Sequence, residues 1–154
     1  MRKPEGEKVV ARAKDLLFKY EVMERHEAGL ALVGTEVKSL REGRANLKDS
    51  YCRFTGYELF LIGVHISQYS HGTHGNHDPE RQRKLLMHKR ELIRLQTKVA
   101  EKGLAIVPAK LYFKDGKVKL EIALVKGKKL YDRRESIKRR EQDREMERAI
   151  KKYK

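Results

Sequence analysis

The chain has 154 residues, of which 39% are hydrophobic, and its 37 basic and 22 acidic residues give a formal net charge of +15. This length suits one domain of about 120 residues with a short extension, and it excludes a second domain. The excess of bases favours a polyanionic partner such as nucleic acid, and no apolar run approaches the roughly 18 residues of a membrane span.

The N-terminal third predicts two strands and a short helix. Apolar and polar residues alternate over 18–23, which predicts a half-buried strand, and a second strand over 30–33 follows an expected turn at 27–29. A helix is predicted over 35–43, where Thr35 can cap the N-terminus and Gly43 can end the helix. Its remaining polar residues, Glu36, Lys38, Ser39 and Arg41, are expected to face solvent or a partner.

The middle of the chain predicts a hairpin, a polar loop and two helices. Strands at about 49–55 and 57–66 meet at Thr55-Gly56, and a loop over 67–77 is rich in Gly, His, Asn and Ser. Asp78-Pro79-Glu80 is typical of a helix start, so we expect helix from there to Gly103, with a break near His88. The cations of this stretch are Arg81, Arg83, Lys84, Lys89 and Arg90.

The last predicted elements are the strands 104–113 and 117–125, which an Asp-Gly turn joins. Six short strands and three helices indicate an α+β domain, and strands of this kind close readily into a small OB-fold-like antiparallel β-barrel. The pattern alone leaves barrel and open sheet undecided. We assign 1–12 to an N-terminal extension, 13–127 to this barrel and 128–154 to a basic C-terminal tail.

The tail cannot bury a face of its own. From Lys126 to Lys154 it holds 13 basic and 6 acidic residues, with Tyr131 among the cations. Cations bind phosphate and an aromatic ring can stack on an unpaired base, so this composition favours RNA over a membrane surface. Helix-promoting i, i+4 pairs such as Glu135 with Arg139 predict a tail that is disordered when free and helical when bound.

The sequence gives weak support to enzymatic activity. His71, His74 and His77 are equally spaced, with His65 and Asp78 nearby, but such spacing in a glycine-rich loop is weak support for a metal site. No nucleophile elbow, phosphate loop or zinc-protease motif is present. Cys52, the single cysteine, excludes a disulfide within the chain and is expected to be a small buried residue. We therefore predict neither catalysis, nor a cofactor, nor a metal, and a metal-dependent nuclease is the least favoured alternative.

Four motifs in order resemble the SsrA-binding protein (small protein B) family. They are Glu27-Ala28-Gly29 followed by Gly34-Thr35-Glu36-Val37-Lys38-Ser39-Leu40-Arg41, then His77 to Glu91, then Pro108-x-Lys110-Leu111-Tyr112-Phe113, and Gly127-Lys128-Lys129-x-Tyr131-Asp132-Arg133-Arg134. One position departs from the pattern, because the family usually has Asn where this chain has Ala13.

The resemblance implies a cytoplasmic partner of transfer-messenger RNA (tmRNA, SsrA RNA) that acts in trans-translation and ribosome rescue. The barrel would grip the elbow of the RNA's transfer-RNA-like half. The tail would enter the decoding centre and the empty message channel. The implied partners are tmRNA, the 30S subunit and the 70S ribosome with 16S ribosomal RNA, and indirectly elongation factor Tu with alanyl-tmRNA.

Carried over to this chain, the resemblance assigns three groups of residues. The elbow surface would comprise Glu36, Lys38, Ser39, Arg41, Lys126, Lys128 and Lys129, and further phosphate contacts would come from Arg81, Arg83, Lys84, Lys89 and Arg90. The tail residues expected on the ribosome are Tyr131, Asp132, Arg133, Arg134, Lys138, Arg139, Arg140, Arg144 and Arg148. A ribosomal or ribosome-assembly protein without a rescue role has the same composition and is the alternative; only the motifs separate the two.

Overall fold

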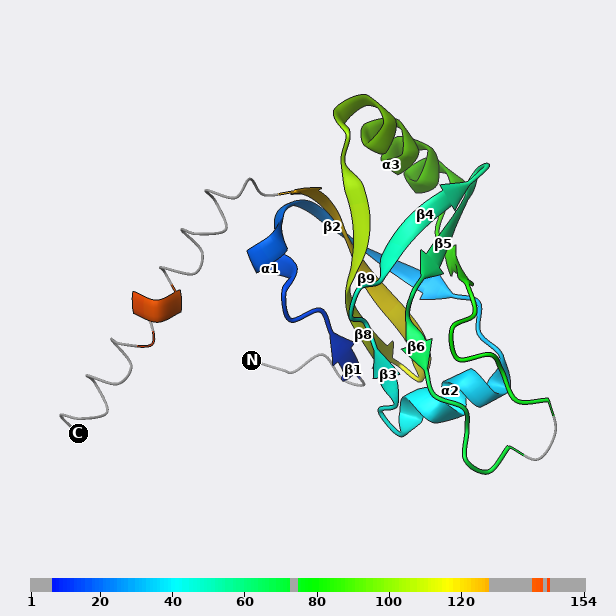
Figure 1. Ribbon diagram of the computed structural model, residues 1–154. Helices are drawn as coiled ribbons and strands as arrows, with labels where there is room; N and C mark the ends of the chain where they lie inside the picture. The colour runs from blue at the N-terminus through cyan, green and yellow to red at the C-terminus, as the bar shows by residue number, and fades with distance from the viewer. Residues whose placement is uncertain (1–6, 73–74, 128–139, 143, 145–154) are drawn as a thin grey trace.

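The computed structural model describes residues 7–72, 75–127, 140–142 and 144. Between residues 7 and 127 the described chain forms nine strands and three helices (Figure 1). The strands are β1 (Lys8–Arg12), β2 (Tyr20–Leu30), β3 (Ala45–Asn46), β4 (Tyr51–Thr55), β5 (Glu58–Ile62), β6 (His65–Ile66), β7 (Arg83–Leu86), β8 (Ala105–Lys114) and β9 (Lys117–Gly127). The helices are α1 (Leu16–Lys19), α2 (Gly34–Arg41) and α3 (Lys89–Lys102).

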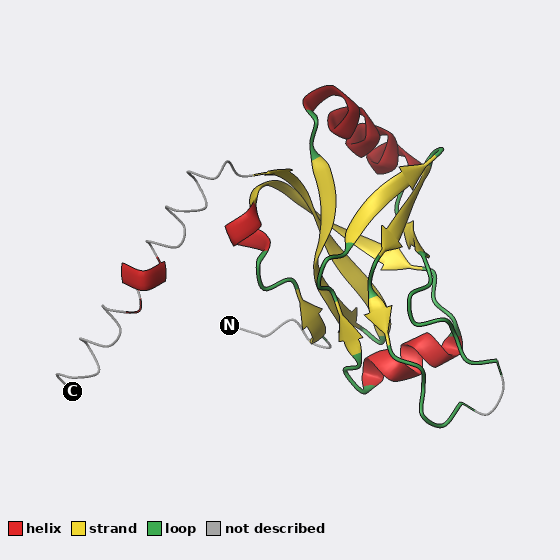
Figure 2. Cartoon of the chain, viewed as in Figure 1, coloured by secondary structure: helices red, strands yellow, loops and turns green. Residues whose placement is uncertain are grey.

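Six strands form a closed ring of antiparallel pairs. The order is β8-β4-β5-β7-β2-β9, and β9 pairs back onto β8 over nearly the whole length of both strands. β1 pairs with β8 outside the ring, and β3 with β6 forms a separate two-stranded sheet. The predicted α+β domain of about six antiparallel strands is confirmed, and so is the number of helices, although α1 was not among the predicted ones. α2 and α3 lie toward opposite ends of the ring (Figure 2).

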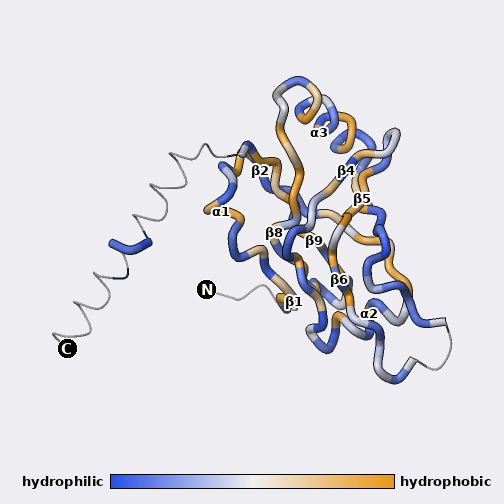
Figure 3. Tube along the Cα trace, viewed as in Figure 1, coloured by the Kyte–Doolittle hydropathy of each residue, from blue (hydrophilic) through white to orange (hydrophobic). Residues whose placement is uncertain are grey.

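The interior of the ring is filled by alternate residues of its strands. Leu59 and Leu61 of β5, Leu111 of β8, and Leu120 and Ile122 of β9 are at most 1% exposed. On the other face of β8 and β9, Val107, Ala109, Ala123 and Val125 form a second buried cluster with Leu16 of α1, so these two strands are hydrophobic on both faces over part of their length. Figure 3 shows the hydropathy of the residues along the chain. Cys52 on β4 is buried in the same core, as expected, and burial raises the pKa of its thiol far above the ordinary value.

The two predicted hairpins are confirmed. Gly56 turns between β4 and β5 with φ of 62°, and Asp115 and Gly116 turn between β8 and β9 with φ of 51° and 77°. Two successive residues with positive φ make the tight turn that matches the twist of paired strands, which is why Asp-Gly is favoured there.

The N-terminal prediction needs correction in three places. β2 is one strand of 11 residues and runs through the expected turn at 27–29, with an irregularity between Val22 and Glu24. Phe18 belongs to α1 and not to a strand. Residues 8–12, assigned to an extension, form β1. The alternating pattern was correct for β2, but it carries no information on how far a strand continues.

The first of the two predicted middle helices is wrong. Asp78-Pro79-Glu80 lies in a turn, residues 83–86 form β7, and helix begins only at Lys89 after the expected break near His88. β7 is required to close the ring because it joins β5 to β2. Tertiary pairing therefore overrides the local helix-start signal. In the parts of the chain that the structure describes, no helix combines the length and apolar character needed to cross a membrane.

Candidate RNA interface

Glu36 lies in the first turn of α2, and its side chain has no solvent exposure. One carboxylate oxygen accepts hydrogen bonds from the Val33 amide at 2.9 Å and from Nη2 of Arg81 at 2.5 Å. The other accepts from Nε of Arg83 at 2.6 Å. The prediction that Glu36 faces solvent is therefore wrong, and Thr35 does not cap the helix either, because its hydroxyl bonds His77.

Arg83 occupies the buried side of β7, also without solvent exposure. Besides Glu36 it donates from Nη1 to the Val64 carbonyl at 2.6 Å and from Nη2 to the Pro79 carbonyl at 3.1 Å. A guanidinium enclosed in this way cannot reach a phosphate, so the expected RNA contact of Arg83 does not fit the structure. Its position instead ties α2, β7 and the turn before β7 into one rigid unit.

The pKa of Glu36 reflects two opposing effects. Burial raises the pKa, but the hydrogen bonds from Arg81, the Val33 amide and Arg83, with the charge of Arg83, outweigh it. The pKa therefore lies below its ordinary value, and Glu36 is a carboxylate at neutral pH. Two arginines around one carboxylate leave a net positive charge at this point.

The outward face of α2 presents cations. Lys38 and Arg41 are exposed, whereas Ser39 is fully buried, which contradicts its expected accessibility. Nζ of Lys38 lies 5.5 Å from the centre of the Tyr69 ring. The Arg81 side chain is 37% exposed while Glu36 and the Ala31 carbonyl hold its Nη2. We call Lys38, Arg41 and Arg81 the α2 surface.

Other predicted cations lie elsewhere on the ring. Lys84 is exposed on β7, 3.2 Å from Glu58, and Lys89 and Arg90 are exposed at the start of α3. Lys126 was expected near α2, but it is nine residues along β9 from Lys117, or about 30 Å at a strand's rise per residue. Lys117 itself, at the other end, lines a hollow of about 340 Å³ with Val37 of α2. The sequence predicted the β8–β9 hairpin that contains Lys117, but it did not predict that this hairpin lies close to α2.

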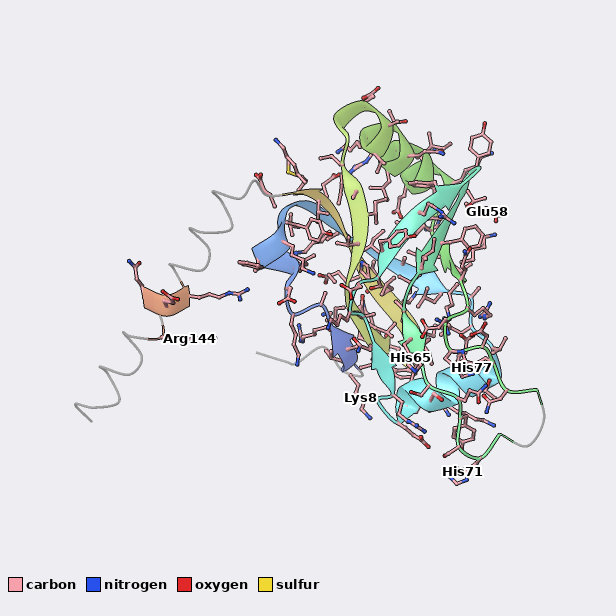
Figure 4. The ribbon with its side chains drawn as sticks, in the orientation of Figure 1. Lys8, Glu58, His65, His71, His77 and Arg144 are labelled. Carbon is pink, nitrogen blue, oxygen red and sulfur yellow. The ribbon has the colours of Figure 1, made fainter. Side chains whose placement is uncertain are left out.

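The histidines of the loop have separate surroundings (Figure 4). Nε2 of His77, which is buried, donates to the Ile66 carbonyl at 2.8 Å, and its Nδ1 is 2.9 Å from the Thr35 hydroxyl. Nδ1 of His65 pairs with Glu80 at 2.6 Å. His71 is exposed with its ring edge-on to Tyr69. His77 thus joins the loop to α2 and β6, a structural role that the spacing of the histidines did not indicate.

Most of the predicted tail site lies outside the described residues. This applies to Lys128, Lys129, Tyr131, Asp132, Arg133, Arg134, Lys138, Arg139 and Arg148. Arg140 and Arg144 are described, and both are helical and exposed. Figure 4 labels Arg144.

A closed antiparallel ring with a strong net positive charge and a cationic helix at one end defines the class of small, OB-like nucleic-acid-binding proteins. Residues 10–152 match the family described as SmpB protein, and the chain belongs to this family. The resemblance inferred from the four motifs is confirmed.

The relatives match almost the whole chain. The SsrA-binding protein of Syntrophobacter fumaroxidans is 56% identical over 147 residues, covering 96% of this chain and 91% of the relative. That of Desulforudis audaxviator is 54% identical over 145 residues, covering 94% and 95%. A solved structure described as "tmRNA-SmpB: a journey to the center of the bacterial ribosome" superposes with a TM-score of 0.66 at 44% identity, covering 82% of this chain and 92% of the other.

Proposed function

We propose that this protein binds the transfer-RNA-like domain of tmRNA and delivers it to stalled ribosomes for trans-translation. The observation that carries the proposal is the identity above 50%, over nearly the full length, to proteins named for binding SsrA RNA. The protein acts in the cytoplasm, where ribosomes translate, and it acts by binding, without a reaction of its own.

The geometry supports α2 as the main contact with the RNA elbow. Lys38 and Arg41 are free to approach phosphates, and the carboxylate of Glu36 fixes Arg81 beside them. Glu36 and Arg83 then serve the site by positioning other groups rather than by touching RNA, and the buried Ser39 does not reach RNA. Lys84, Lys89 and Arg90 can extend the contact along β7 and α3.

The second part of the proposal concerns the ribosome. Lys126, Lys128, Lys129 and the tail from Tyr131 to Arg148 carry a cation excess that suits the decoding centre and the empty message channel of the 30S subunit. Tyr131 stacks there on a base of 16S ribosomal RNA. Elongation factor Tu meets the protein only through alanyl-tmRNA, in the 70S complex.

Isolation of the protein from its host, followed by sequencing of the RNA that accompanies it, tests this function. We expect tmRNA as the dominant small RNA, and a Lys38→Ala, Arg41→Ala double variant should lose most of it. Recovery of ribosomal RNA alone would instead indicate a ribosomal or ribosome-assembly protein.

A further inference from the structure

The outer face of β4, β5 and β7 carries aromatic rings and cations in adjacent positions. Arg53 on β4 lies directly opposite Phe60 on β5, which lies opposite Lys84 on β7. In the neighbouring cross-strand pair on the same face, Tyr51 of β4 lies opposite Ile62 of β5. We call Tyr51, Arg53, Phe60 and Lys84 the outer row. A phenyl ring between two cations is thus built across three paired strands, within a width of about 10 Å.

The pleat of the strands directs this set away from the core. Cys52, Leu59, Leu61 and Leu85 alternate with the outer row and are buried. Tyr51 and Phe60 stand on the opposite face, and they are diagonal neighbours at about 7–8 Å. Two rings at that separation can each stack on one of two consecutive unpaired bases.

Large apolar side chains are exposed at both ends of this face. Tyr51 is 42% exposed, Leu86 on β7 is 51% exposed, and Tyr57 at the tip of the β4–β5 hairpin is 77% exposed. Tyr51, at the Ile62 end of the β4–β5 pair, is the exposed ring of the outer row, and Phe60 beside it is half-buried. Leu86 and Tyr57 lie at the hairpin end of the same strands, apart from Tyr51.

Charge and continuity indicate which partner fits. Arg53 is exposed and forms no ion pair with another described residue, while Lys84 faces only Glu58, at 3.2 Å. Cations beside stacking rings match the phosphates and bases of a single strand. The face also leads toward the α2 surface, because β5 continues into β6, which contacts α2.

We propose that the outer row binds two unpaired bases of the same RNA that the α2 surface holds, with Phe60 and Tyr51 stacking on them and Arg53 and Lys84 contacting the adjoining phosphates. This inference rests on the proposed function and adds a ligand, unpaired nucleotides in a loop of tmRNA, to a face of the ring on which only Lys84 of the outer row belongs to the family motifs. The bases are read by stacking, so the site tolerates different bases in these two positions.

The test uses the full-length chain and a transcript of the transfer-RNA-like domain of tmRNA. Phe60→Leu and Tyr51→Leu keep an apolar side chain but remove the ring, and each should weaken binding on the order of 10-fold at an unchanged melting temperature. Tyr57→Leu is the matched control, since Tyr57 is an exposed ring in the turn between β4 and β5, outside the outer row, and the affinity of this variant should not change. Arg53→Ala should lower the slope of log affinity against log salt by about one.

A second measurement does not depend on the stability of the variants. Transcripts carrying 4-thiouridine at loop positions should cross-link to the peptides that contain Tyr51 or Phe60. This inference would be overturned, and the proposed function left intact, if both leucine variants bound the transcript with unchanged affinity while the Lys38→Ala, Arg41→Ala variant did not bind it. Failure of the unaltered chain to bind the transcript would overturn both. Leucine variants that bind the transcript normally but bind ribosomes poorly would assign the face to a ribosomal partner instead, which also contradicts the proposal.

Discussion

Glu36 shows how a single buried carboxylate can organise a surface that it does not touch. Its two partners lie 45 and 47 residues further along the chain, so no local pattern could reveal them. The sequence marks Glu36 as a helix N-terminal acid, and that role alone would place it in solvent. Burial of Arg83 on the inner side of a strand is equally unexpected, because the sequence predicts a helix at Arg83 and an arginine is seldom fully buried.

The first prediction at this scale concerns stability. Glu36→Ala should lower the free energy of unfolding by about 3–5 kcal/mol, because it leaves the buried Arg83 without its counter-charge. Glu58→Ala, which removes the exposed partner of Lys84, should cost less than about 1 kcal/mol. Denaturant titration of both variants measures this difference. Equal effects would mean that the Glu36 network does not stabilise the fold.

The pH dependence of stability gives a second prediction for the same residue. The pKa of Glu36 is lowered in the folded state, so the unfolded chain binds more protons in the interval between the two values, and stability rises with pH there. The stabilisation is fully present above the unfolded value of about 4.5 and is lost as the pH falls through the folded value. The free-energy difference between the unaltered protein and Glu36→Gln should therefore be constant at neutral pH and shrink below about pH 4.5. A difference that does not change between pH 7 and pH 3 would contradict this assignment.

At the scale of elements, side chains such as His77 and Asn76 hold the loop before β7. His77 connects it to Thr35 of α2 and to Ile66 of β6, and the Nδ2 group of Asn76 donates to the Tyr69 carbonyl at 2.8 Å. His77→Ala should leave a buried carbonyl unpaired and cost about 1–3 kcal/mol, whereas His71→Ala should be nearly neutral because His71 is exposed. Thermal unfolding of the two single variants measures the contrast. Indistinguishable variants would show that the loop does not depend on His77.

The elements also show where prediction from the sequence stops. The hairpins at Gly56 and Asp115-Gly116 follow from turn chemistry that involves only neighbouring residues, and they were placed correctly. β7 was missed because its strand conformation is imposed by β5 on one side and β2 on the other, while Asp78-Pro79-Glu80 locally favours a helix. The position of Lys117 beside α2 was not predicted for a related reason, because the two segments come together only when the ring closes.

At the scale of the whole molecule, two kinds of basic surface are distributed along one short chain. The ring holds its cations in fixed positions through pairs such as Arg81 with Glu36, whereas the segment after Gly127 has a cation excess and few apolar residues. A preformed surface binds RNA at a lower ordering cost than a segment that must fold on binding. The proposed division of labour follows: the ring selects tmRNA, and the tail acts only within the ribosome.

Truncation of the chain after Gly127 tests this division. The shortened protein should fold and keep much of its affinity for free tmRNA, because α2 and the outer row are unaffected, but it should fail to support tagging on stalled ribosomes. The physical reason is that like charges such as Arg140 and Arg144 repel along a helix, and surrounding ribosomal RNA offsets this repulsion. Binding is measured by titration with the labelled RNA, and tagging by the appearance of tagged peptide in a reconstituted translation system. Tagging at the full rate by the truncated chain would contradict the proposed role of the tail, and loss of affinity for free tmRNA would show that the ring does not bind it alone.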